Sequence, residues 1–135
     1  MFIFDTQEDP ILAMKLLGRV EPTDEAAYLE ALTLIARRTR RFGLISVVDV
    51  DSGRISQETR RAQSIWFKEN RPHLARLCFG LVRVRPKVDP AQKDDEAFRR
   101  AMPFPSVRVA LEREARPILE AWRAADPRSL GEAAS

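Results

Sequence analysis

The side chains of this sequence that could carry chemistry gather just after a short apolar segment, Leu44–Val50. This region supplies carboxylates, hydroxyls and guanidinium groups. If the segment is a parallel strand, its carboxyl edge is where open α/β sheets bind ligands, so Asp49 and Asp51 are the best candidate carboxylates. The tentative binding residues are Asp49, Asp51, Ser52, Arg54, Ser56 and Arg60.

The sequence does not contain a recognisable catalytic constellation. The single histidine, His73, follows Pro72 in an expected surface turn and has no Ser or Cys partner in a triad-like arrangement. The single cysteine, Cys78, rules out a zinc cluster of several cysteines. No glycine-rich phosphate loop follows an expected strand, which disfavours nucleotides. We therefore expect no enzyme activity, no cofactor and no metal.

The composition is that of a soluble globular domain. With 135 residues, 44% hydrophobic and 32% charged, the chain can bury one core. Its net charge of +3 does not indicate a nucleic-acid partner, and we assign the arginines at Arg37–Arg41 to the last turn of a helix, where they complement the dipole. The absence of a leader-like or membrane-spanning apolar run and the low cysteine content favour a cytoplasmic protein.

Three apolar segments and a hairpin predict the strands. Leu44–Val50 is β-branched and apolar on both faces, as expected for a central parallel strand, and Leu77–Val84 should lie beside it. Phe2–Phe4 and Ile11–Leu17 flank a polar loop that ends in Pro10, which predicts an antiparallel hairpin. Val107–Ala110 is expected as a last short strand.

Helices are predicted between the strands from apolar periodicity and caps. The first should run from about Asp24, after a Thr23 cap, to Arg40, with Gly43 as a left-handed residue beyond its end. The second should start at a Ser56 cap and bury Ile65 and Trp66. Two more are expected at Asp94–Ala101 and Glu112–Ala125, the last with Trp122 largely buried.

This ββαβαβαβα order predicts an α/β fold. The expected sheet is single and small, with about five strands, mostly parallel, with the antiparallel N-terminal hairpin at its edge and helices packed on it. Residues 1–127 should form one domain, and residues 128–135 a frayed tail.

Several segments together carry a family resemblance. They are the hairpin, the glycine before Pro22-Thr23-Asp24-Glu25, the strand ending in Val-Val-Asp-Val, the helix at residues 61–71, and the segments at residues 77–84 and 107–122. In this order they resemble the bacterial SpoIIAA-like group, which belongs with the STAS domains and is related in fold to the Sec14 (CRAL-TRIO) lipid-binding module. The resemblance implies a small α/β domain that acts as a binding partner in regulation.

The resemblance also raises the question of phosphorylation, because some STAS members are switched at a Ser or Thr that begins the helix after the central strand. Ser56 holds that place here, with Ser52 earlier in Asp51-Ser52-Gly53. The favoured interpretation is structural, with Ser52 in a turn and Ser56 as a helix cap. A phosphate on Ser56 would nevertheless meet helix amides with Arg54, Arg60 or Arg61 near.

Three classes of function stay open. A non-enzymatic regulatory or interaction domain leads and predicts a protein partner or self-association. The alternative is a small-molecule or lipid-binding module, which requires an apolar pocket between a helix and the sheet. An enzyme that uses Asp49, Asp51 and an arginine is the least favoured.

Overall fold

The computed structural model describes residues 1–52, 55–88 and 96–127. The expected tail at residues 128–135 and the candidate Arg54 therefore lie outside the described residues. The elements, in chain order, are β1 (Phe2–Asp5), β2 (Ile11–Gly18), α1 (Pro22–Ala36), β3 (Phe42–Val50), α2 (Gln57–Glu69), α3 (Arg71–Leu77), β4 (Cys78–Val84), α4 (Glu96–Ala101), β5 (Ser106–Val109), a 3-10 turn (Glu112–Glu114) and α5 (Ala115–Ala125).

The five strands form one sheet in the order β1-β2-β3-β4-β5. β1 pairs with β2 antiparallel, and every other neighbouring pair is parallel. This confirms the predicted α/β fold with its N-terminal hairpin at the edge. The two most apolar strands, β3 and β4, are adjacent and mostly buried, as their sequences predicted, with Leu44 opposite Leu81.

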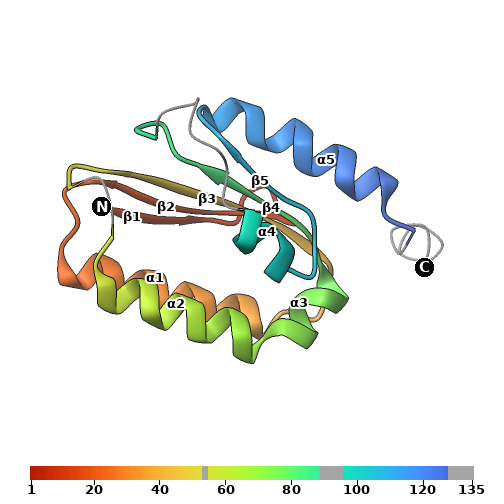
Figure 1. Ribbon diagram of the computed structural model, residues 1–135, viewed down its shortest axis with the longest axis horizontal. Helices are drawn as coiled ribbons and strands as arrows, with labels where there is room; N and C mark the ends of the chain where they lie inside the picture. The colour runs from red at the N-terminus through yellow and green to blue at the C-terminus, as the bar shows by residue number, and fades with distance from the viewer. Residues whose placement is uncertain (53–54, 89–95, 128–135) are drawn as a thin grey trace.

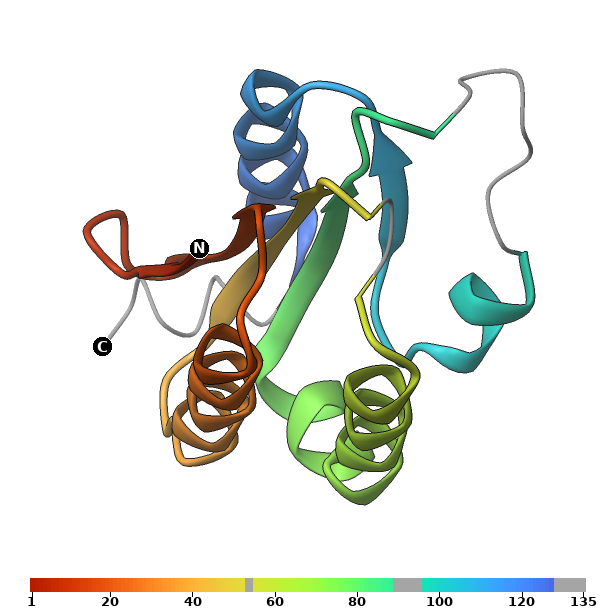
Figure 2. The ribbon, with the colours of Figure 1, turned by 90° about the vertical axis from the view of Figure 1, so that its left-hand side faces the viewer.

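Helices cover both faces of the sheet. In Figure 1 the sheet lies between α5 and the layer that contains α1, α2 and α3, and Figure 2 shows the same two layers from the side. Each parallel strand pairs with the next strand along the chain. When the connections between such neighbours are right-handed, the connecting helices all lie on the same face of the sheet. Among the helices that the structure describes, α5, which follows β5, is the one that packs on the opposite face, against β3 and β4.

Two glycines allow close packing on the α5 face. A Cβ on Gly43 would lie 2.5 Å from Phe79 Cε2, and a Cβ on Gly80 would lie 2.8 Å from Trp122 Cζ3. Gly43 is thus a strand residue beneath an aromatic ring, and the prediction of a left-handed residue after the first helix is wrong. Trp122 is only partly buried, less than we expected.

Helix α1 begins and ends earlier than its sequence suggested. Glu21, not Thr23, is the N-cap residue, because the Asp24 carboxylate accepts a hydrogen bond from the Glu21 amide at 2.8 Å. The helix ends at Ala36, so the arginines at Arg37–Arg41 follow it and do not occupy its last turn. The prediction that these arginines complement the helix dipole from its last turn is therefore wrong. Arg38 forms an ion pair with Asp9, and Arg41 with Asp126.

A further helix, α3, occupies the place where we expected a turn. Pro72 lies near its start, where the missing amide hydrogen of proline is tolerated. His73 is partly buried, with Nε2 3.1 Å from the Ile35 carbonyl oxygen and its ring tilted against Phe42. It is therefore a packing residue between α3, α1 and β3 and not a solvated surface side chain.

Candidate functional site

The structure divides the residues that the sequence placed in one site. Along β3, Ser46, Val48 and Val50 point toward α1 and α2, whereas Ile45 and Val47 point toward α5. Because side chains alternate along a strand, Asp49 lies on the α5 face. There its carboxylate is 3.3 Å from Lys87 Nζ. Asp49 is thus separated by the sheet from the candidates on α2.

The other described candidates lie near the start of α2. Asp51 and Ser52 are exposed in the turn after β3. Ser56 caps α2, as predicted, because its Oγ accepts a hydrogen bond from the Thr59 amide at 3.2 Å. Arg60, in the first turns of α2, is exposed and also lines a cavity beneath the helix.

The topology explains why the strand edge alone does not form a ligand crevice. Such crevices form where neighbouring connections leave a sheet toward opposite faces. Here the parallel strands follow one another in order, and α1 and α2 lie on the same face. The short helix α4 also reaches this face, since Phe98 packs edge-on against Phe67 of α2. A binding site is therefore more naturally placed between these helices and the sheet than at the strand edge.

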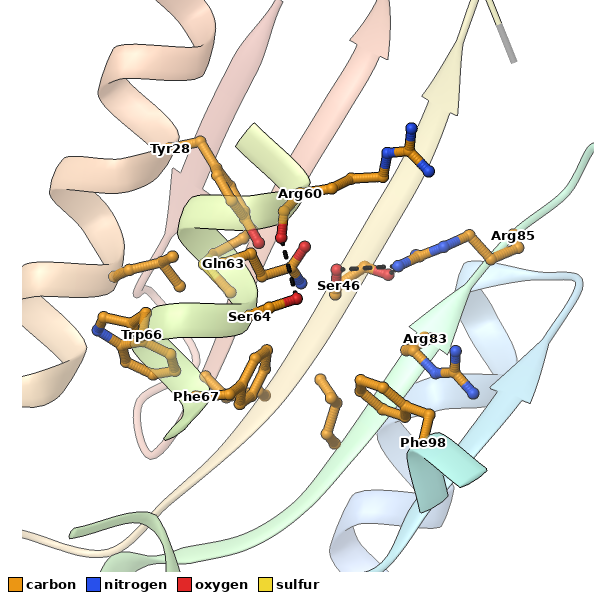
Figure 3. Close-up of a pocket in the computed structure, with 14 residues that line it drawn as sticks. Tyr28, Ser46, Arg60, Gln63, Ser64, Trp66, Phe67, Arg83, Arg85 and Phe98 are labelled. Carbon is orange, nitrogen blue, oxygen red and sulfur yellow. Dashed lines mark hydrogen bonds between the residues drawn. The ribbon is translucent and has the colours of Figure 1, made fainter. Parts of the chain in front are cut away.

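A cavity of about 230 Å³ occupies that place (Figure 3). Its floor consists of buried apolar side chains from three parallel strands: Met14, Leu44 and Leu81. One wall is aromatic and joins α2 to α4, with ring centroids 5.1 Å apart for Trp66 and Phe67 and 6.1 Å apart for Phe67 and Phe98. The apolar pocket required by the small-molecule alternative is thus present.

Tyr28 of α1 provides an unusual polar group in this cavity. The residue is 3% exposed, and its hydroxyl makes no hydrogen bond with any residue that the structure describes. Burial raises the pKa of Tyr28 to about 12, although the positive charge of Arg85 acts in the opposite direction. The hydroxyl is therefore a protonated donor at neutral pH. In Figure 3 it points toward the space between α2 and β3.

Three arginines line the cavity. Arg85 donates to the Ser46 carbonyl oxygen at 2.6 Å and to Ser46 Oγ at 3.4 Å, which holds its guanidinium over β3. The guanidinium of Arg83 lies 4.3 Å from the centroid of the Phe98 ring, within cation–π range. Arg60 lines the cavity from α2, and no acidic side chain is among the described residues around it.

Sequence reasoning found only Arg60 among the polar residues of this cavity. It missed Tyr28, assigned simply to a buried helix face, and the polar side chains of β3 and β4. A signal was present, because Ser46 and Arg83 interrupt strands that are largely apolar, and Arg85 directly follows the second of these strands. Polar residues on a covered face of a buried strand require partners, and their registry, Ser46 beside Arg83, places them on the same face.

Comparison with known proteins found no match: no family model, curated protein or solved structure matches the chain. In the described part of the chain, no helix has both the length and the apolar character needed to cross a membrane. Within the same residues, no three His, Cys, Asp or Glu side chains are grouped as metal ligands would be.

Proposed function

We propose that this protein is a non-enzymatic binding domain whose cavity between α2 and the sheet takes a small molecule with an apolar body. The observation that carries this proposal is the cavity itself, with its apolar floor, its aromatic wall and the Tyr28 hydroxyl, which makes no hydrogen bond with a described residue. Ligand sites are typically apolar hollows with a few placed polar groups. Among the described lining residues there is no carboxylate or histidine to act as a general base.

The size of the cavity limits the ligand. Its 230 Å³ is smaller than the roughly 300 to 1,000 Å³ of typical drug-sized sites. It corresponds to about eight water molecules at about 30 Å³ each. A compact molecule therefore fits better than the long acyl chain of a membrane lipid, so we place this domain with small-molecule binders rather than lipid carriers.

The proposal is tested by filling the cavity from its rim. Ser64 of α2 lines the cavity, is exposed, and bonds only to the Arg60 carbonyl oxygen of its own helix. Ser64→Trp should therefore fold normally and occupy the entrance. We expect ligand-detected NMR with a library of small aromatic and aliphatic compounds to find binders of the unmodified protein that Ser64→Trp no longer binds.

Glu69→Trp is the matched control, because Glu69 is exposed on the same helix but does not line the cavity. It should leave binding unchanged. If no compound binds the unmodified protein, or if both tryptophan variants retain binding equally, the cavity is not a ligand site.

A protein contact is a second candidate, favoured by the outer surface of the helix layer. Leu34 of α1 is 48% exposed and Ile65 of α2 is 49% exposed, whereas we had expected Ile65 to be buried. The two helices pack side by side. The resemblance to regulatory STAS domains and the exposed Asp51, Ser52 and Ser56 also support this role. Sedimentation at increasing protein concentration tests self-association through this surface.

A further inference from the structure

We infer that the cavity between α2 and the sheet selects a compact apolar molecule that carries a carboxamide group, and that the side-chain amide of Gln63 determines this specificity by pairing with it. This inference rests on the proposed function, because it names the ligand class of the same cavity. The observation behind it is a polar residue at an inward-facing position of α2, without a hydrogen-bond partner among the residues that the structure describes.

Gln63 lies on the face of α2 that packs on the sheet. Thr59, Gln63, Trp66 and Phe67 follow one another at helical spacing. Thr59 is only 4% exposed, and Trp66 and Phe67 pack against the core. Gln63 itself is partly buried and lines the cavity. Apolar side chains are the ordinary occupants of such a face, so a glutamine here requires a partner for its amide.

The Gln63 amide is available to a ligand. It makes no hydrogen bond with a described residue, whereas the neighbouring Ser64 bonds to the Arg60 carbonyl oxygen. Neither its nitrogen nor its oxygen is among the described side-chain atoms that are both fully buried and unpaired, so both atoms border open space. In Figure 3 the amide points from α2 toward the part of β3 that carries Ser46.

The chemistry of this amide selects its partner. A glutamine side chain presents a carbonyl acceptor beside an N–H donor. Such a pair can hold a ligand edge through two hydrogen bonds when that edge also offers a donor beside an acceptor, as glutamine does with adenine. A carboxamide has this arrangement. A ketone or a carboxylate has no donor, so each can make only one of the two bonds.

The arginines around the cavity do not compete for this role. Arg85 donates to Ser46, and the Arg83 guanidinium lies over the Phe98 ring. Arg60 is exposed, and in Figure 3 its guanidinium lies apart from the Gln63 amide. The Gln63 amide is thus a neutral group without a partner, which favours a neutral ligand group over a charged one.

The apolar part of the cavity sets the rest of the molecule. Its floor is formed by Met14, Leu44 and Leu81, and Phe67 and Phe98 stand at the side. Aromatic side chains contact other rings favourably edge-on or offset. One ring with a short chain to its carboxamide therefore suits a cavity of 230 Å³.

The experiment uses the full chain and isothermal titration calorimetry with three probes of the same shape. They are 3-phenylpropanamide, 4-phenylbutan-2-one, in which a methyl group replaces the amide nitrogen, and 3-phenylpropionate, in which an oxygen replaces it. We expect the amide to bind with a dissociation constant of about 0.1 to 1 mM, as suits a ligand with few atoms. The ketone and the carboxylate should each bind about fivefold to tenfold more weakly, because each lacks the hydrogen bond that the amide donates.

Paired variants test the role of Gln63. Gln63→Leu removes both the donor and the acceptor, so it should reduce the ratio of amide to ketone affinity to about one. Gln57→Leu is the matched control, because Gln57 is exposed on the same helix and does not line this cavity. It should leave the ratio unchanged. A merely structural role of Gln63 would weaken all three probes alike and would not alter the ratio.

The outcomes separate the two proposals. If the ketone or the carboxylate binds as tightly as the amide, or if Gln63→Leu keeps the preference for the amide, the carboxamide inference is overturned and the small-molecule site stands. The same holds if no probe binds but the small-molecule library yields other binders. If the library also yields none, the proposed function itself fails. Should Gln63→Leu not fold, the three probes still decide with the unmodified protein.

Discussion

At the scale of single residues, Tyr28 has the most informative environment. It is the only tyrosine of the chain and is almost completely buried beneath α1. Its ring packs edge-on against Phe2, with centroids 5.8 Å apart, while its hydroxyl borders the cavity. One side chain thus belongs both to the core and to the proposed binding site.

The raised pKa of Tyr28 predicts a specific loss of stability in alkali. In the unfolded chain the hydroxyl ionises near its ordinary pKa of 10.0, whereas in the folded protein it resists ionisation until about 12. The folded state therefore loses stability as the pH rises from 10 to 12, by about 3 kcal/mol in total. Urea unfolding of the unmodified protein and of Tyr28→Phe should show this difference at high pH and little difference at pH 8 or below.

Because there is no other tyrosine, ultraviolet absorbance of tyrosinate reports this residue alone. A folded-state titration midpoint close to the ordinary value would mean that the hydroxyl is in contact with bulk water. In that case the cavity would not be the enclosed site described above.

The residue scale is also where the sequence was least informative about the site. Asp49 and Asp51 were selected by their position after an apolar strand, yet Asp49 is on the opposite face from the cavity and Asp51 is exposed. Which residues share a cavity depends on strand order and on the faces that helices cover. Neither is encoded locally, so of the chosen residues that the structure describes only Arg60 lines the cavity.

At the scale of elements, the contact between β4 and α5 depends on a glycine. Gly80 lets the Trp122 ring lie directly on the strand, and any Cβ at this position would overlap that ring. The closeness of this packing explains why α5 makes more contacts with β4 than with any other strand. A partly buried tryptophan thus anchors the one described helix on this face of the sheet.

Gly80→Ala should destabilise the protein by about 1 to 3 kcal/mol, because the added methyl group displaces the Trp122 ring. Trp122→Ala should destabilise it by about 2 to 3 kcal/mol, less than full burial would imply, because the ring is only partly buried. In the double variant the methyl group meets no ring, so the two effects should not add. Chemical denaturation of the three variants measures this coupling, and strict additivity would contradict the contact.

Element boundaries show which local signals are decisive. The sequence predicted the cap of α2 correctly, because Ser56 is the first residue with a suitable side chain after the turn. At α1 it misassigned the cap to Thr23, because it overlooked the local capping box in which Glu21 is the N-cap residue and Asp24 accepts its amide. Asp24 also accepts the Phe2 amide at 3.1 Å, a contact between the helix start and β1 that local propensity does not include.

At the scale of the whole molecule, the ion pair between Arg41 and Asp126 joins the start of β3 to the end of α5. The Arg41 side chain is only 7% exposed, and its guanidinium also lies over the Phe79 ring at 5.9 Å from the centroid. Charged groups this deeply buried are stabilised mainly by their partners, so the loss of this ion pair weakens the stabilisation of the charge that remains.

Asp126→Ala should therefore destabilise the fold, by up to about 3 kcal/mol. Replacement of both partners, as Arg41→Met with Asp126→Leu, should have a smaller effect, because the buried guanidinium is removed together with its ion-pair partner. Thermal unfolding of the single and double variants tests the prediction. A single variant as stable as the unmodified protein would show that this pair does not hold α5 in place.

The overall architecture was the part best predicted from sequence. Apolar runs and helical periodicity alternate along the chain, and right-handed connections leave few ways to assemble such an order. The fold class, the hairpin edge and the adjacency of β3 and β4 followed from these rules. The unexpected α3 and the arginines beyond α1 did not, because short helices and buried ion pairs depend on the assembled structure.

The strand order has a consequence for how the chain acquires its structure. Every strand pairs with the one before it in sequence, so no pairing must wait for a segment that comes later. On the ribosome, the hairpin is complete before β3 emerges, and each new strand adds to an existing edge. Loops that close between consecutive neighbours lose less entropy than long-range closures, which favours rapid folding for a mainly parallel sheet. Helix α5, which follows the last described strand, emerges after the sheet and covers the face opposite α1 and α2.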